Sequence, residues 1–91
     1  RLSMAPPLVV MEIVSPGEVQ RNRDYVAKRS QYEAIGIPEY WLVDPQAGTI
    51  LILTVRNGQY EEAARLQGTD AVRSPQLGDL KATMAEVFAA A

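Results

Sequence analysis

The sequence contains no cysteine and no histidine. Without cysteine the chain forms neither disulfides nor a thiol nucleophile, which suits a cytoplasmic protein. Without histidine it builds neither a Ser-His-Asp triad nor a histidine-ligated zinc site. A metal site here has to use oxygen ligands, which suit Mg²⁺, Mn²⁺ or Ca²⁺. No apolar run approaches the roughly 20 residues that span a bilayer, so we expect no membrane partner.

Lysine is also scarce, since only Lys28 and Lys81 are present. The formal net charge of −2 gives no overall attraction to nucleic acid or to anionic membranes. Positive charge nevertheless gathers in one short stretch that contains Arg21, Arg23, Lys28 and Arg29. This cluster either contacts phosphates or forms an ordinary solvated helix face, in which Asp24 pairs with Lys28 one turn away.

Hydrophobic periodicity and turn signals predict one small domain of mixed secondary structure. The expected elements are a strand at 8–14, a helix at about 23–35, strands at 38–44, 49–56 and 59–66, and a terminal helix from about 83. Asn22 is the expected N-cap of the first helix, and Asn57-Gly58 is a strong hairpin signal. A strand-helix-strand crossover followed by antiparallel hairpins places the chain in the α/β (α+β) class, with a mixed sheet.

Glu12 stands out because it interrupts an aliphatic strand that looks buried on both faces. An isolated buried charge is costly, so it is usually paired, bound to metal or protonated. Glu12 lies near the carboxyl end of its strand, where open α/β sheets place their ligand sites. On the helix, Tyr25, Lys28 and Tyr32 share one stripe by their spacing. We therefore predict that Lys28 meets Glu12 at the strand end.

Each of these residues also has a purely structural interpretation. A Glu–Lys pair can be a plain packing feature, and Lys28 can extend its ammonium to water. The tyrosines and Trp41 are typical core residues, and Asp44 before Pro45 is typical of a turn. One long helix covers only one face of the 8–14 strand. The other face is expected to be covered by a partner chain or by sequence upstream of Arg1.

Three segments in fixed order, "LVVMEIVSPG", "NRDYVAKRSQY" and "GIPEYWLVDP", resemble the Uma-two family of bacterial endonucleases. The later segment "SPQLGDLKATMAEVF" is similar to the C-terminal tail of that family. The family in turn resembles the restriction-endonuclease-like PD-(D/E)XK nucleases. The resemblance implies a restriction-endonuclease-like core, DNA as the partner, and phosphodiester hydrolysis that depends on Mg²⁺ or Mn²⁺.

The resemblance also implies roles for individual residues. Glu12 corresponds to the acidic, metal-binding residue of the (D/E)XK element, while Val14 stands where the lysine of that element is expected. Lys28 matches a catalytic lysine that has moved to the following helix. Asp24 and Tyr32, one turn before and after it, match supporting positions. The arginines at 21, 23 and 29 are candidate phosphate contacts.

The resemblance further implies that residues 1–91 form a partial domain, the C-terminal half of the family's fold. The first metal-binding aspartate is expected upstream of Arg1, and Pro7 stands where some family members have Asp. A competing interpretation is a non-catalytic interaction or dimerisation module built on the nuclease fold. Under both interpretations we expect a homo-oligomer that pairs through the 8–14 strand, because its edge and one face are predicted to be uncovered.

Overall fold

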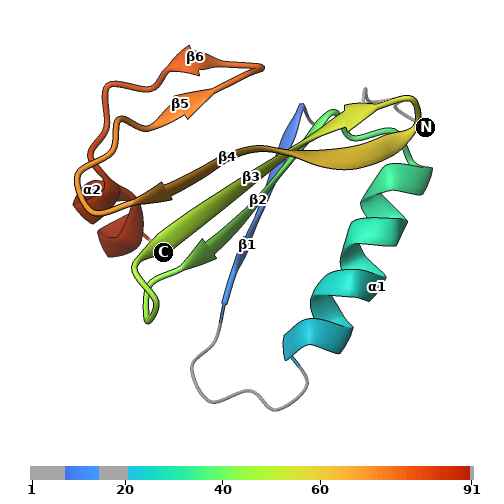
Figure 1. The fold of residues 1–91 in the computed structure, drawn as a ribbon, viewed down its shortest axis with the longest axis horizontal. Helices are drawn as coiled ribbons and strands as arrows, with labels where there is room; N and C mark the ends of the chain where they lie inside the picture. The colour runs from blue at the N-terminus through green and yellow to red at the C-terminus, as the bar shows by residue number, and fades with distance from the viewer. Residues whose placement is uncertain (1–7, 15–20, 91) are drawn as a thin grey trace, which may run out of the picture.

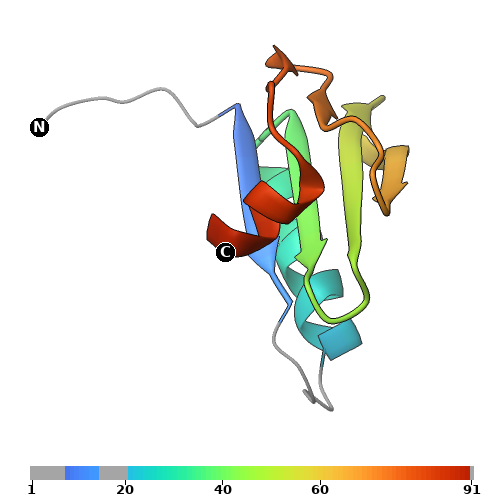
Figure 2. The same cartoon turned by 90° about the vertical axis from the view of Figure 1, so that its left-hand side faces the viewer.

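The computed structural model describes residues 8–14 and 21–90, and within 21–27 it describes the backbone alone. One sheet contains β1 (Val9–Ile13), β2 (Glu39–Asp44), β3 (Thr49–Arg56) and β4 (Gln59–Gln67). The helices are α1 (Arg21–Ala34) and α2 (Met84–Ala90), and a small hairpin is formed by β5 (Arg73–Ser74) and β6 (Gly78–Asp79). Figures 1 and 2 show α1 on one side of the sheet, with α2 and the hairpin on the other.

The strand order in the sheet is β1-β2-β3-β4. β1 runs parallel to β2, with Glu12 beside Leu42, whereas β2–β3 and β3–β4 are antiparallel. The sheet is therefore mixed, and β1-α1-β2 is a crossover between parallel neighbours. This arrangement confirms the predicted α+β class and is compatible with a restriction-endonuclease-like fold. β1 and β4 are the two outer strands of this sheet (Figure 2).

Local sequence signals account for the turn and the terminal helix. Asn57 and Gly58 have φ angles of 54° and 79°, which are the positive values that a tight type I′ hairpin turn requires. Before α2, the Glu86 amide donates to Thr83 Oγ1 at 3.1 Å, and the Thr83 amide donates to Glu86 Oε1 at 3.0 Å. This reciprocal capping box fixes the start of a short helix. The predicted N-cap at Asn22 is wrong, because α1 already begins at Arg21.

The two faces of the sheet carry separate hydrophobic clusters. The cluster on the α2 side contains buried Trp41, Val43, Ile50, Ile52, Val72 and Met84. The cluster on the α1 side contains buried Tyr40, Leu53 and Tyr60, with Tyr32 of the helix packed against them. Alternation along β2 explains the division, since successive strand residues point to opposite faces. Trp41 is a core residue, as predicted.

The first strand looked buried on both faces by its composition, but one of its faces is largely exposed, in agreement with the expected uncovered edge and face. Met11 and Ile13 expose 46% and 44% of their surface, on the face that α2 covers in part. The physical reason is position, because β1 lies at the edge of the sheet and has a paired neighbour on one side alone within the described chain. Neither described helix has the length and apolar character that crossing a membrane requires.

Candidate functional site

The carboxylate of Glu12 is held by two side chains from α1. Lys28 Nζ donates to Glu12 Oε2 at 3.1 Å, which makes both a hydrogen bond and an ion pair. The Tyr32 hydroxyl donates to the other oxygen, Oε1, at 2.6 Å. Both oxygens of Glu12 are thus engaged by groups that lie one helical turn apart. The predicted meeting of Glu12 and Lys28 is present, and Tyr32 joins it.

The local structure explains why these three residues meet. Glu12 is the penultimate residue of β1, and alternation turns it to the α1 face together with Val10. Lys28 and Tyr32 are four residues apart and therefore project from the same face of α1. Helix α1 contacts both outer strands, since Arg29 and Glu33 bond to Tyr60 of β4 while Lys28 and Tyr32 bond to Glu12 of β1.

The site is reachable from solvent. The side chains of Lys28 and Glu12 are 46% and 19% exposed. An ion pair this open contributes little to folding, typically about 0–1 kcal/mol, because water and salt screen it. Stability alone therefore gives little reason to place an acid and a base together here. A ligand that arrives from solution can reach both side chains.

Tyr32 keeps its proton over an unusually wide pH range. Its hydrogen bond to the Glu12 carboxylate raises the pKa of Tyr32 to about 12, and burial and the negative charge of Glu12 act in the same direction. The phenol is therefore a permanent donor near neutral pH. It donates to Oε1 of Glu12, while the ammonium of Lys28 donates to Oε2.

An aromatic stack supports Tyr32 from behind. The rings of Tyr32 and Tyr40 meet edge to face with centroids 5.2 Å apart, and Tyr40 and Tyr60 follow at 5.7 Å. Tyr60 is anchored by its hydroxyl, which donates to the carbonyl of Ile37 at 2.8 Å. Burial raises the pKa of Tyr60, and the nearby Glu33 carboxylate adds to that rise. This stack restricts the Tyr32 ring, and with it the orientation of Glu12.

Arg29 is engaged with the far edge of the sheet. Its Nη2 donates to the backbone carbonyl of Tyr60 at 2.9 Å, and its Nε lies 3.9 Å from Glu33 Oε2. Arg29 still exposes 45% of its side chain, so its predicted contact with phosphate stays a prediction. The side chains of Arg21, Arg23 and Asp24 lie outside the residues that the structure describes in full.

Glu12 is the carboxylate that the sequence predicts as a metal ligand. Its oxygens are hard ligands of the kind that Mg²⁺ and Mn²⁺ accept. Among the residues that the structure describes, no group of three or more acidic side chains gathers around one point. Asp44 ends β2, the parallel neighbour of β1, and its Oδ1 accepts from the Ala47 amide at 3.0 Å. That bond agrees with the predicted turn role of Asp44.

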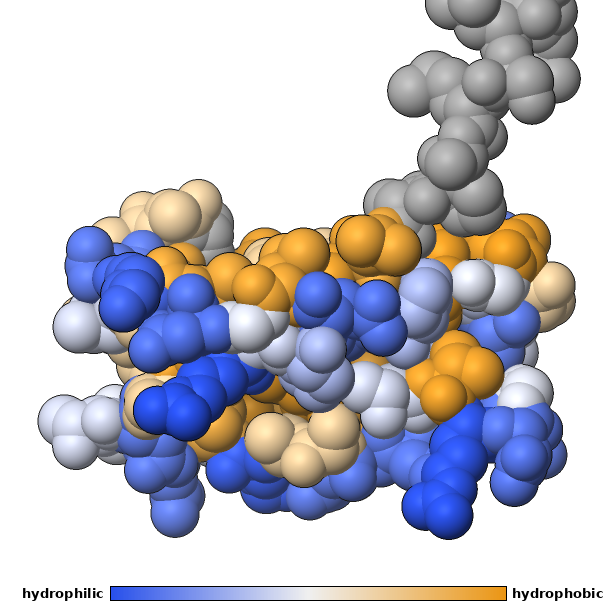
Figure 3. All heavy atoms as spheres, turned by 90° about the horizontal axis from the view of Figure 1, so that it is seen from above, coloured by the Kyte–Doolittle hydropathy of each residue, from blue (hydrophilic) through white to orange (hydrophobic). Residues whose placement is uncertain are grey.

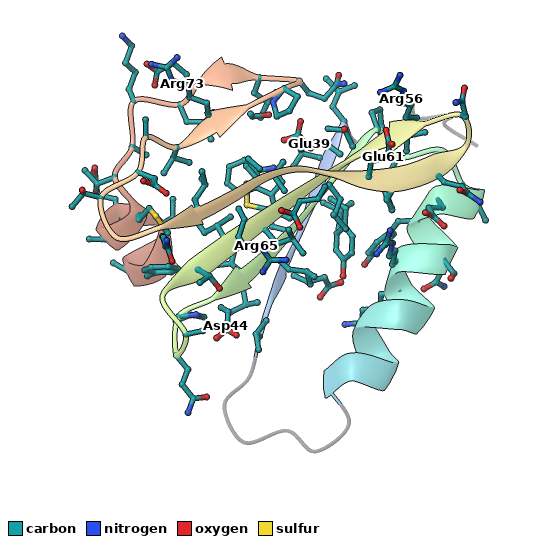
Figure 4. The ribbon with its side chains drawn as sticks, viewed as in Figure 1. Glu39, Asp44, Arg56, Glu61, Arg65 and Arg73 are labelled. Carbon is teal, nitrogen blue, oxygen red and sulfur yellow. The ribbon has the colours of Figure 1, made fainter. Side chains whose placement is uncertain are left out.

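The sequence pattern does not single out Glu39, yet it is the most enclosed acidic residue described. It has no exposed surface, and three donors reach it. Trp41 Nε1 and Ser74 Oγ donate to Oε2 at 2.5 and 2.6 Å, and the Gln76 amide donates to Oε1 at 2.8 Å. Figure 4 shows Glu39 between the sheet and the small hairpin, far from Asp44 at the other end of β2. The sequence did contain one signal that Glu39 is buried. It lies two residues before the core residue Trp41 on the same strand, so both side chains share one buried face.

Comparison with known proteins agrees with this arrangement. Residues 1–85 match the model of the Uma2 family, whose description is "putative restriction endonuclease". No curated protein matches the sequence. The match extends over β1, α1 and the four-stranded sheet, and thus includes Glu12, Lys28 and Tyr32. The chain therefore belongs to the Uma2 family.

Proposed function

We propose that this protein acts as a DNA endonuclease that depends on Mg²⁺ or Mn²⁺, and that Glu12 and Lys28 belong to its hydrolytic site. The observation that carries the proposal is the accessible Glu12–Lys28–Tyr32 cluster at the carboxyl end of β1. Membership of a family whose description is "putative restriction endonuclease" supports the nuclease class.

The roles follow from the chemistry of each side chain. Glu12 is the metal ligand, because it offers carboxylate oxygens at a solvent-reachable position. The Mg²⁺ or Mn²⁺ that Glu12 would hold would supply charge stabilisation at the phosphate and would lower the pKa of a water molecule. The ammonium of Lys28 carries the positive charge that faces the phosphate oxygens as negative charge develops on them. Tyr32 holds Glu12 in place through Oε1.

Substrate attraction falls to the basic stretch on α1. Phosphate contacts by lysine and arginine supply most sequence-independent affinity for DNA, which makes it sensitive to salt. Arg29, with Arg21 and Arg23 earlier on the same helix, is proposed for this task. Cytoplasmic location and assembly into a homo-oligomer complete the proposal. The outer edge of β1 supports the latter, because Met11 and Ile13 are exposed on it.

The experiment is a plasmid-cleavage assay with Mn²⁺ and with Mg²⁺. Glu12→Gln and Lys28→Ala are each expected to reduce cleavage by at least about 100-fold, the usual scale for losing a charged catalytic group. Matched controls are Glu62→Gln, an exposed acid on β4, and Lys81→Asn, the other lysine. Asn is chosen because Lys81 has a φ of 57°, which Asn tolerates better than Ala. Full cleavage by either site variant contradicts the assigned role.

A second candidate function is a non-catalytic interaction module, and the exposed apolar edge of β1 favours it. The two candidates differ in what Glu12→Gln changes. If the protein is an interaction module, this substitution alters assembly or stability. It then has no effect on metal binding, because the module binds no metal. For the nuclease, it removes Mn²⁺ binding while the fold stays intact. Manganese binding followed by electron paramagnetic resonance distinguishes them.

A further inference from the structure

Two side chains of α1 hold the backbone of Tyr60, near the start of β4. The Tyr60 amide donates to Glu33 Oε2 at 2.6 Å, and the Tyr60 carbonyl accepts from Arg29 Nη2 at 2.9 Å. Arg29 and Glu33 are four residues apart and form an ion pair, with Nε and Oε2 3.9 Å apart. In a sheet, a neighbouring strand supplies one acceptor and one donor to such a residue. Here the helix supplies both, so direct bonds attach α1 to β4.

The same helix is bonded to the other outer strand of the sheet by the adjacent pair of residues. Lys28 and Tyr32 donate to the carboxylate of Glu12 on β1. Each of them comes one residue before a member of the Arg29–Glu33 pair, and successive helix positions lie about 100° apart around the axis. Two attachments at different angles restrict the rotation of α1 about its axis. The bonds to β4 therefore help to determine where the side chains that meet Glu12 are placed.

Tyr60 is itself held firmly at the point of attachment. It is 3% exposed, and its ring contacts the ring of Tyr40. Its hydroxyl donates to the carbonyl of Ile37, which follows the end of α1, and the Ile37 amide donates to the Tyr32 carbonyl at 3.1 Å. Tyr60 is thus bonded to α1 through its backbone and to the turn after α1 through its side chain. It provides a fixed reference for the orientation of the helix.

The attachment to β4 has a larger effect on geometry than the ion pair has on stability. The side chains of Arg29 and Glu33 are 45% and 22% exposed, and an ion pair this open contributes little to folding. An atom about 5–6 Å from a helix axis moves by about 1 Å when the helix rotates by about 10°. A displacement of about 1 Å in a catalytic group can lower a rate by about 100-fold. The side chains that meet Glu12 are therefore sensitive to the bonds that α1 makes to β4.

We propose that Glu33 is a positioning residue for the cluster of Glu12, Lys28 and Tyr32. By accepting from the Tyr60 amide, Glu33 fixes the rotation of α1 that brings the two donors of the helix to the carboxylate on β1. It acts through these side chains and contacts neither the metal nor the phosphate. The expected effect on DNA cleavage rests on the proposed function. The expected effect on the contact between Tyr32 and Glu12 does not.

Two conservative variants separate the length of the Glu33 side chain from its charge. Glu33→Asp keeps the charge but is one methylene shorter, whereas Glu33→Gln keeps the length and an acceptor oxygen. We vary Glu33 because Arg29 is also proposed to contact phosphate. Glu33→Asp is expected to lower kcat for plasmid cleavage by roughly 10-fold or more, with KM within about twofold of wild type. Glu33→Gln is expected to keep kcat within about threefold. Equal losses, or a larger loss in Glu33→Gln, overturn the proposal.

The contact between Tyr32 and Glu12 gives a second readout, which needs neither DNA nor metal. Nuclear Overhauser effects between the Tyr32 ring protons and the Glu12 γ protons are expected in the wild-type protein and in Glu33→Gln. They are expected to weaken in Glu33→Asp and to disappear in Glu33→Ala. Circular dichroism checks that each variant is folded, and if Glu33→Ala is not, the comparison of Asp with Gln decides. Effects of equal strength in wild type and Glu33→Asp overturn the proposal.

The matched control is Glu62→Ala. Glu62 is an exposed acid of β4, and its ion pair with Arg65 at 3.0 Å stays within the strand. Figure 3 shows mostly hydrophilic residues along its lower border, which is the side of β4. Loss of one acid from this solvated surface is expected to leave kcat and the Overhauser effects unchanged. Losses in Glu62→Ala equal to those in Glu33→Ala overturn the proposal.

The two readouts separate the positioning role from the proposed function. If the wild-type protein cleaves no DNA, the proposed function fails, and the Overhauser effects alone decide the role of Glu33. If Glu12→Gln and Lys28→Ala abolish cleavage while Glu33→Asp changes neither kcat nor the contact, the nuclease assignment stands and the positioning role is overturned. A Glu33→Asp variant that loses the contact but keeps kcat likewise overturns it.

Discussion

Glu12 and Glu39 both lie in apolar strands of the same sheet, yet their surroundings differ in every respect that matters for function. Glu39 has no exposed surface, and its partners are an indole N–H, a hydroxyl and a backbone amide. Glu12 is partly exposed, and its partners are an ammonium and a phenol on long side chains. The first arrangement is closed to solvent, whereas the second is open to it.

The difference shows how to separate a structural acid from one that binds ligands. Three donors from two segments converge on Glu39, and they tie β2 to the β5–β6 hairpin across 35 and 37 positions of sequence. No basic side chain of the described chain contacts it, so it offers no ion pair for a substrate to replace. At Glu12, by contrast, the proposed function requires a metal ion to take the place of the Lys28 ammonium, and the exposure of this ion pair is compatible with that exchange.

The largest expected effect is loss of stability on substitution of Glu39. Glu39→Ala leaves the buried indole of Trp41 and the hydroxyl of Ser74 without an acceptor. Each such group costs about 1–3 kcal/mol, so the free energy of unfolding should fall by roughly 2–6 kcal/mol. Urea unfolding followed by the fluorescence of Trp41, the one tryptophan, measures it. If Glu39→Ala lowered the free energy of unfolding by less than Glu12→Ala does, Glu39 would not be the structural acid of the two.

A smaller effect is expected for Ser74→Ala. This change removes one donor to Glu39 and the acceptor of the Leu77 amide, which lies 3.0 Å from Ser74 Oγ. We expect a loss of about 1–3 kcal/mol, together with faster amide exchange in the hairpin. The same urea unfolding experiment measures the loss of stability. An unchanged rate of amide exchange at Leu77 would contradict the role of Ser74 in linking the hairpin to Glu39.

Glu12→Gln is expected to change the free energy of unfolding by about 1 kcal/mol or less, because its ion pair with Lys28 is exposed. The variant keeps a side chain that accepts from Tyr32. Chemical denaturation beside wild type and Glu62→Gln gives the comparison. A destabilisation as large as that of Glu39→Ala would assign Glu12 to the structural class.

The most subtle expected effect is on the titration of Tyr32. Its pKa of about 12 depends first on the hydrogen bond to the Glu12 carboxylate, so Glu12→Gln should lower it toward the usual 10. Folded Tyr32 keeps its proton between pH 10 and 12, where the unfolded chain loses it. Its contribution to stability is therefore complete below pH 10 and disappears as pH rises through 12. Carbon-13 shifts of the tyrosine rings report this titration, and an unchanged Tyr32 pKa in Glu12→Gln would contradict the assigned cause.

Sequence patterns predicted much of this fold because its strands carry strong local signals. The strand at 49–56 and the Asn57-Gly58 turn are confirmed residue for residue. Glu12, Lys28 and Tyr32 could be brought together from strand alternation and helical spacing, aided by the family resemblance. These are short-range regularities, and they survive folding largely unchanged.

The failures have a common physical origin. Alternation places Met11 and Ile13 on one face of their strand, but it does not reveal that the distant helix α2 covers that face in part. It also does not reveal which distant donor reaches a side chain. Glu39 depends on Ser74, 35 residues later, and nothing local announces that contact. Long-range hydrogen bonds of this kind are visible in the folded chain alone.

The most direct test of the difference between the two acids is carboxyl-carbon NMR during titration with Mn²⁺. Paramagnetic broadening falls steeply with distance, so it identifies the carboxylate nearest the ion. We expect the Glu12 resonance to broaden first, while that of Glu39 stays sharp. Broadening of Glu39 before Glu12, or equal behaviour of both, would contradict the assignment of Glu12 as the cation-binding carboxylate.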